Sequence, residues 1–141
     1  MPIELTDEMK ERIDGAFDNE TPIVVAYVDG QGAPHLSFRG TTQVLGQDRL
    51  AIWARNPEGG LPNALDQNPR VALLYRDPAA RRSLSMSGRA RVAPELSDTV
   101  YERSPERERE RDPEHMGVAI VVDLDHVMSA APDGVVRMQR D

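Results

Sequence analysis

The chain has 141 residues, a formal net charge of -7 and no cysteine, with 39% hydrophobic and 29% charged residues. This length predicts one domain, residues 1–141, around one hydrophobic core. The absence of cysteine excludes disulfides, thiolate nucleophiles and Cys-ligated zinc or iron–sulfur sites. No uncharged stretch approaches the roughly 20 residues that cross a bilayer, and the acidic start lacks the basic and apolar regions of a signal peptide. We therefore expect a cytoplasmic protein with no membrane partner.

The charge is unevenly distributed. Residues 1–38 carry a net charge of -6, residues 39–91 of +5 and residues 92–141 of -6. The acidic total argues against a nucleic-acid binder, which neutralises many phosphates. A basic middle segment is compatible with a local anion site, because a cleft can focus positive potential. The alternative is chance segregation of charge. Sixteen of the seventeen basic residues are arginine, which suits bidentate contacts with phosphate or carboxylate, although a GC-rich genome gives the same bias.

Hydrophobic periodicity predicts one helix and three strands in the first half of the chain. Thr6 is a helix-capping residue, and the apolar side chains that follow it recur on one helical face. An Asp-Gly turn at 29–32 separates two extended segments, and a second turn at 46–48 ends the return strand. The predicted elements are a helix over 6–17 and strands over 23–29, 35–45 and 50–53.

The second half alternates short helices with longer strands. Asn68 and Pro69 stop a two-turn helix, and Gly88 predicts a bulge or bend within a strand. Residues 102–115 are mixed in charge and free of apolar side chains, which favours a solvated loop or helix over a site. The longer segment 97–115 is either a solvated connector, which we favour, or a cap on the site. The predicted elements are helices over 61–67 and 94–103 and strands over 70–75, 83–92 and 117–124, the last extended by 125–131.

About six antiparallel strands with two or three short helices, and no βαβ repeat, predict a mainly β, α+β domain built on a barrel. Trp53 is expected to fill the barrel, although it could instead wall a ring-shaped ligand. The segment Val118 to Val122 is apolar and compatible with a buried interface between subunits.

Few patterns in the sequence carry chemistry. No phosphate-binding loop, Rossmann fingerprint or nucleophile elbow occurs. Asp123 and Asp125 share one face of a strand, while His126 points to the other, so we expect no metal site there. No catalytic side chain is predicted. The segment 53–63 is different, because it places arginine, asparagine and a glycine pair at a strand end before a helix. It is either a phosphate seat or an ordinary strand-to-helix turn.

Three motifs within residues 20–93 carry a resemblance to a known family. They are D-G-x-x-x-P at 29–34, N-P-R-V-A at 68–72 and G-x-A at 88–90. In their order and spacing the chain resembles the pyridoxamine 5′-phosphate oxidase-like family of FMN-binding split β-barrels. Within it, the chain is similar to the flavin- and deazaflavin-dependent oxidoreductases common in actinobacteria.

The resemblance implies a homodimer that holds FMN or the deazaflavin coenzyme F420 in grooves between subunits and transfers a hydride to or from a small organic substrate. The alternative is a non-catalytic split barrel that binds a flavin or a tetrapyrrole-type ligand. The cofactor-binding residues implied by the resemblance are Ser37, Phe38, Arg39, Gly40, Thr41, Thr42, Arg55, Asn56, Gly59, Gly60, Leu61, Asn63 and Ser83.

The chain departs from the family pattern at two places. Many FMN-binding members have a basic pair where this chain has Gly60 and Leu61. Arg39, Arg55 or Arg82 could hold the phosphate instead, because guanidinium groups bind phosphate bidentately. An arginine-rich stretch over 70–91 would suit the acidic oligoglutamate tail of the deazaflavin, which favours F420. The final residues lack the R-x-H pattern of true pyridoxamine phosphate oxidases, so that substrate is not expected.

Overall fold

The computed structural model describes residues 1–141. The strands are β1 (Val24–Val28), β2 (Pro34–Phe38), β3 (Gln43–Val44), β4 (Arg49–Ala54), β5 (Arg70–Asp77), β6 (Arg82–Val92), β7 (Val118–Ala131) and β8 (Gly134–Gln139). The helices are α1 (Asp7–Gly15), α2 (Gly60–Leu65), the 3-10 turn η1 (Pro94–Leu96), α3 (Ser97–Arg103) and α4 (Glu106–Arg109).

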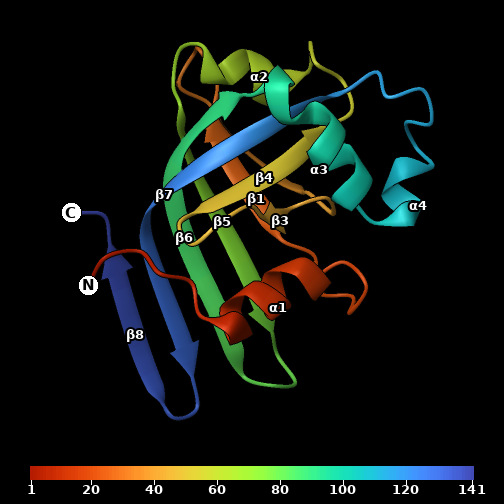
Figure 1. The fold of residues 1–141 in the computed structure, drawn as a ribbon. Helices are drawn as coiled ribbons and strands as arrows, with labels where there is room; N and C mark the ends of the chain where they lie inside the picture. The colour runs from red at the N-terminus through yellow and green to blue at the C-terminus, as the bar shows by residue number, and fades with distance from the viewer.

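All strands belong to one antiparallel sheet that curls into an incomplete barrel (Figure 1). The strand order is β2-β1-β5-β6-β7-β4-β3, and β8 pairs with the second half of β7. The two outer strands of this order, β2 and β3, follow each other in the chain and are joined by residues 39–42. The barrel is therefore split between these two strands, which confirms the predicted split-barrel α+β fold.

The sheet has eight strands, whereas about six were predicted, because one predicted strand is divided in two and β8 was not predicted. The predicted return strand over 35–45 is interrupted at 39–42, where the chain crosses the split. At the other end of the chain, β7 continues to Ala131 and returns as β8 through a tight turn in which Gly134 has a φ of 144°. The Pro-Asp-Gly sequence at 132–134 is a turn signal that could have predicted this hairpin.

The barrel is filled by a main hydrophobic cluster of 25 buried residues, and a second cluster lies outside it. Helix α3 supplies Val100 and Tyr101 to the second cluster, where they pack on Trp53 and Ala119 of β4 and β7. The first half of β7 is therefore covered on both faces, and Val118–Val122 are all buried within this one chain. Burial within one chain therefore accounts for the apolar character of this segment. Trp53 is a core residue, as expected, but it packs in the second cluster beneath α3 and does not fill the barrel.

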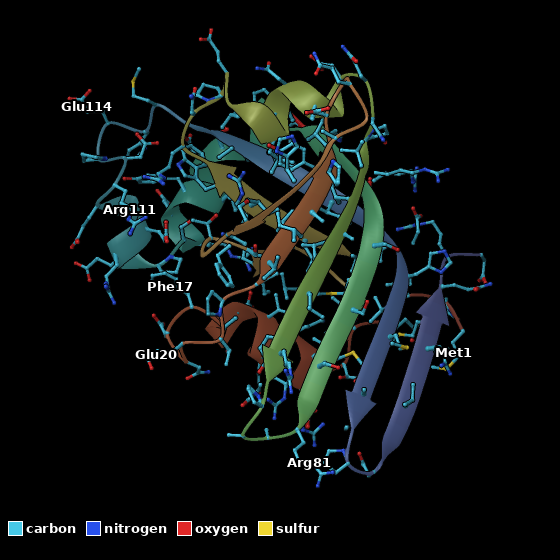
Figure 2. All side chains as sticks on the ribbon, turned by 180° about the vertical axis from the view of Figure 1, so that it is seen from behind. Met1, Phe17, Glu20, Arg81, Arg111 and Glu114 are labelled. Atoms are coloured by element: carbon cyan, nitrogen blue, oxygen red, sulfur yellow. The ribbon has the colours of Figure 1, made fainter.

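Helix α1 packs Met9 and Ile13 into the main cluster, and side chains fill the space between it and the sheet (Figure 2). Its first turn is capped by Thr6, whose Oγ1 accepts a hydrogen bond of 3.2 Å from the Met9 N–H. No helix in the structure has both the length and the apolar character needed to cross a lipid bilayer.

We expect Thr6→Ala to lower the free energy of unfolding by about 1 kcal/mol, the usual value of a side-chain N-cap. Thr99→Ala is the matched control, because Thr99 is exposed within α3. Urea unfolding of both variants tests this. Equal stability of the two would show that the cap hydrogen bond contributes nothing.

Candidate functional site

A hollow of about 290 Å³ lies at the end of the barrel beside α2. It brings together two arginines from opposite sides of the split: Arg39 follows β2, and Arg55 follows β4. The remaining lining comes from the end of β4, from the turn that leads into α2 and from the first turn of that helix. The full lining is Arg39, Ala54, Arg55, Asn56, Gly59, Gly60, Leu61 and Pro62.

Arg39 is held rigidly at the split. Its backbone N–H donates to the Ile23 carbonyl at 2.9 Å, and its Nε donates to Ser37 Oγ at 3.0 Å. Burial lowers the pKa of the Arg39 guanidinium, and the nearby positive charge of Arg55 adds to this, while Tyr27 acts in the opposite direction. Neither arginine forms an ion pair with a carboxylate. The hollow thus has an uncompensated double positive charge that an anion would relieve.

The turn before α2 is built by its own asparagines. Asn56 Oδ1 accepts from the Glu58 N–H at 3.0 Å, and Asn63 Nδ2 donates to the Glu58 carbonyl at 2.7 Å. At Gly60, a Cβ atom would lie 2.4 Å from the Tyr27 hydroxyl. A glycine at this position therefore leaves room for the Tyr27 hydroxyl beside the hollow. This is a physical reason why residue 60 is a glycine and not the basic residue of many FMN-binding split barrels.

Four other predicted site residues support the site without lining the hollow. Ser37 accepts from Arg39, and Thr42 Oγ1 donates to the Arg39 carbonyl at 2.8 Å. Thr41 is buried, and its hydroxyl joins the backbone of Trp53 by donating to the carbonyl and accepting from the N–H. Gly40 is packed against Phe17 and Glu108. These residues fix the chain that crosses the split.

Phe38 and Ser83 lie apart from the hollow. Phe38 is 69% exposed on the outer face of β2. Ser83 lies at the start of β6, beside the turn that contains Arg81, and this turn is at the opposite end of the sheet from α2 (Figure 2). Within one chain, these two residues and the Arg39–Arg55 hollow do not form one site.

Tyr27 is a neighbour of the hollow that the sequence analysis missed. Its ring stacks on His35 with centroids 4.9 Å apart, and His35 Nε2 lies 2.8 Å from Asp29 Oδ2. The hydrogen bond with His35, followed by those from the Ala33 and Gln31 N–H groups, lowers the pKa of Asp29. Strand alternation places Tyr27 on the same face as the buried Val25, so its inward direction could have been predicted.

No protein-family model and no curated protein matches this sequence. Solved structures do share its fold. A pyridoxamine 5′-phosphate oxidase-related, FMN-binding protein from Nostoc punctiforme is similar with a TM-score of 0.71 and 12% identity, over 92% of this chain and 85% of that one. PhzG from Burkholderia lata, solved with tetrahydrophenazine-1-carboxylic acid, has a TM-score of 0.72 and 13% identity, over 99% and 88%. An F420 reductase has a TM-score of 0.60 and 21% identity, over 76% and 88%.

These similarities show the fold of this chain. The neighbours include pyridoxamine 5′-phosphate oxidase-related proteins, as the resemblance of the three sequence motifs predicted. Because fold alone does not determine chemistry, function has to be argued from the hollow itself.

Proposed function

We propose that this protein binds a phosphate-bearing flavin-type cofactor and uses it to transfer a hydride to or from a small organic molecule. The observation that carries the proposal is the meeting of Arg39 and Arg55 in one hollow without a carboxylate partner. Neighbours of the same fold are described as an FMN-binding protein and an F420 reductase, which supports this choice of cofactor.

The residues of the hollow fit a phosphate group. Two guanidinium groups offer planar pairs of N–H donors, a geometry that suits phosphate oxygens. Arg39 loses little freedom on binding, because Ser37 and the Ile23 carbonyl already hold it. The flavin-type cofactor would supply the hydride chemistry, while Arg39 and Arg55 would bind and orient its phosphate. No side-chain nucleophile is required.

Between the two candidate cofactors, we favour F420 over FMN. Gly60 and Leu61 leave the first turn of α2 without the basic pair of many FMN binders, and Leu61 is buried in the core. The surplus positive charge of residues 39–91 would attract the acidic tail of the deazaflavin. Titrating the protein with FMN and with F420 in parallel distinguishes the two. The protein should be saturated at low concentration by its own cofactor alone.

We also propose that the protein is a homodimer that associates through the outer face of β1, β2 and β5. Leu36, Phe38 and Leu74 are 74%, 69% and 46% exposed there. Strand register places Phe38 and Leu74 on either side of Val24, which makes one apolar patch. Such patches mark contact surfaces. Sedimentation of the wild type and of Phe38→Lys should give a dimer and a monomer, respectively.

We expect Arg55→Ala to weaken FMN or F420 binding about tenfold or more, because a charge-assisted hydrogen bond contributes about 1.5–3 kcal/mol. Riboflavin, which lacks the phosphate, should bind the wild type and the variant equally. Arg76→Ala is the matched control, since Arg76 is exposed on β5 and has no ion pair. Fluorescence titration measures all of these affinities. Unchanged affinity of Arg55→Ala for the phosphorylated cofactor would remove Arg55 from the site.

The alternative function, a non-catalytic binding protein, differs from the enzyme in turnover alone. The cofactor-loaded protein should oxidise or reduce members of a panel of quinones, enones and tetrapyrroles. Tight binding of the cofactor without turnover of any of them would favour the binding protein.

A further inference from the structure

A hollow of about 330 Å³ lies at the edge strand β3, between the end of α1 and the junction of α3 with α4 (Figure 1). We call it the polar hollow, because its lining is polar apart from Pro105. It shares no residue with the hollow of Arg39 and Arg55 or with the apolar patch of the proposed dimer contact. The polar residues of its lining are Asp14, Asp18, Thr41, Thr42, Gln43 and Arg103.

Gln43 brings an acceptor without a donor to the polar hollow. The residue is only 4% exposed, and its Nε2 donates to the carbonyls of Thr41 and Val100 at 3.1 and 3.2 Å. Because both partners are acceptors, they fix which end of the amide is the nitrogen. Oε1 is therefore left buried with no hydrogen-bond partner. A buried acceptor without a donor is costly, so a ligand that offers an N–H group here would remove that cost.

The ionised groups of the lining give the polar hollow one net negative charge, from Asp14, Asp18 and Arg103. None of the three belongs to an ion pair. Asp14 Oδ1 accepts from the Val44 N–H, and Arg103 Nη2 donates to the Val44 carbonyl, each at 2.8 Å. These two side chains close the free edge of β3. Asp18 is exposed and has no such task, so its carboxylate is available to a ligand.

The charges around the polar hollow also favour a cation. Directly beside the lining residues in the chain, the charged residues are Glu102 and Glu106, which are both acidic. Lys10 of α1 forms no ion pair. On α4, Arg107 is followed by Glu108, and these two charges cancel. The surplus negative charge of the lining is therefore not neutralised from outside.

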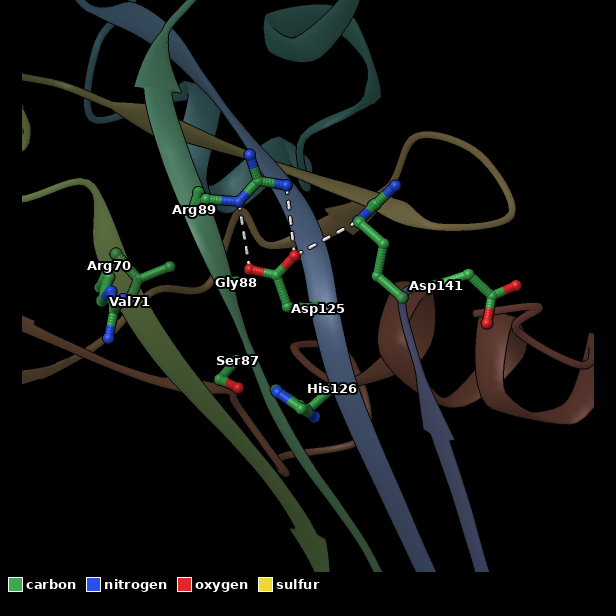
Figure 3. Close-up of a pocket in the computed structure, with 9 residues that line it drawn as sticks. Arg70, Val71, Ser87, Gly88, Arg89, Asp125, His126 and Asp141 are labelled. Carbon is green, nitrogen blue, oxygen red and sulfur yellow. Dashed lines mark hydrogen bonds and ion pairs between the residues drawn. The ribbon is translucent and has the colours of Figure 1, made fainter. Parts of the chain in front are cut away.

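A larger hollow, of about 550 Å³, lies over β5, β6 and β7, but the carboxylate at its centre is already paired. A β-bulge in β7 leaves Asp125 without a partner on β6 and turns it toward this hollow beside His126 (Figure 3). The expectation that these two side chains point to opposite faces is therefore wrong. Arg89 donates to Asp125 at 3.1 and 3.2 Å, and Arg140 lies 3.3 Å from it. The carboxylates of the polar hollow have no such partners.

We propose that the polar hollow binds a small polar primary amine, with its ammonium group on the Asp18 carboxylate and Gln43 Oε1. An ammonium group carries one positive charge and three N–H donors, which match the net charge of the lining and its unpartnered acceptor. A divalent metal ion fits less well, because it takes six or more ligands and no group of three acidic or histidine side chains is available to hold it.

The size and polarity of the polar hollow define the rest of the ligand. Its volume is at the lower end of the range for small-molecule sites. The polar lining favours a body that carries hydroxyl groups over an alkyl chain, so an amino alcohol is the class that fits. Binding here uses no residue of the proposed cofactor hollow, and its test therefore stands apart from that of the flavin.

The test is an NMR titration of the ¹⁵N-labelled protein with 2-amino-1,3-propanediol and with glycerol, in which a hydroxyl replaces the amino group. We expect the amine to saturate with a Kd of about 1 mM or below and to shift the side-chain amide signals of Gln43. Glycerol should bind about tenfold more weakly or less well still, because it lacks the charge. Absence of saturation, or equal affinity for glycerol, would overturn the proposal.

Two variants test the carboxylate. Asp18→Asn should weaken binding of the amine about tenfold and leave the fold intact, since Asp18 is exposed. Asp7→Asn, exposed at the other end of α1, is the matched control and should leave the affinity within about twofold. Equal affinities of the two variants would contradict the proposal. Displacement of the amine by an equimolar amount of Mg²⁺ would also contradict it, because the hollow would then be a metal site.

Discussion

Gly88→Ala is expected to lower the free energy of unfolding by about 3 kcal/mol, at the upper end of the usual cost of overpacking. A Cβ atom at this position would lie 2.1 Å from the Asp123 carbonyl oxygen and 3.0 Å from Leu124 Cα. Both atoms belong to the backbone of β7, which passes over Gly88 where the bulge begins. No side chain can rotate away to relieve the contact, so the strand itself has to move.

Gly46→Ala is the matched control for this prediction. Nothing lies within 4 Å of a Cβ at Gly46. This variant should leave stability unchanged or raise it by up to about 1 kcal/mol, because alanine restricts the unfolded chain. Urea unfolding of the two variants gives the comparison. If both were as stable as the wild type, β7 could not approach Gly88 as closely as the structure shows.

The bulge illustrates what can be predicted about this fold from sequence. A glycine within the strand over 83–92 signals an irregularity, and the structure has one beside it. The pattern does not tell which of two paired strands contains the extra residue, because that depends on register between segments about 35 residues apart. The extra residue is Asp125 of β7, so the predicted directions of Asp125 and His126 were wrong.

The same distinction between local and distant information holds for the site. Arg55, Asn56, Gly59 and Gly60 are near one another in the chain, and the structure keeps them in one hollow. The neighbouring Tyr27 comes from another strand, and its contact with the site depends on a glycine more than thirty residues later. An apolar strand such as Val118–Val122 is equally compatible with an interface or a core. Only the packing of Val100 and Tyr101 on the sheet decides between them.

Residues 102–115 are predicted to be a solvated connector, and most of their side chains are exposed. Ser104 and Asp112 are the exceptions, and Asp112 carries the charge. It is buried, with Oδ2 accepting from Trp53 Nε1 at 3.0 Å and from the Gly117 N–H at 2.9 Å, and Oδ1 accepting from the Met116 N–H at 2.8 Å. Its own carbonyl accepts from the Tyr101 hydroxyl at 2.9 Å. One carboxylate thus anchors the segment to the second hydrophobic cluster.

We expect Asp112→Asn to lower the free energy of unfolding by about 3 kcal/mol at neutral pH, because the amide NH₂ would face an N–H donor in a buried place. Asp98→Asn, at an exposed position of α3, is the control and should change stability by less than about 0.5 kcal/mol. Urea unfolding at pH 7 measures both. A loss in Asp112→Asn no larger than in Asp98→Asn would mean that the anchor contributes little.

The charge of Asp112 adds a dependence on pH. Burial acts to raise its pKa, but the hydrogen bonds from Met116, Gly117 and Trp53 outweigh burial and hold the pKa below its ordinary value of 3.8. A carboxylate whose pKa is lower in the folded state stabilises the protein fully above its unfolded pKa, and this contribution is lost as the pH falls through the folded pKa. The stability difference between wild type and Asp112→Asn should therefore be constant from neutral pH to about pH 5 and shrink below about pH 4. A difference that stayed constant down to about pH 2 would show that shape alone, and not the carboxylate charge, holds the segment on Trp53.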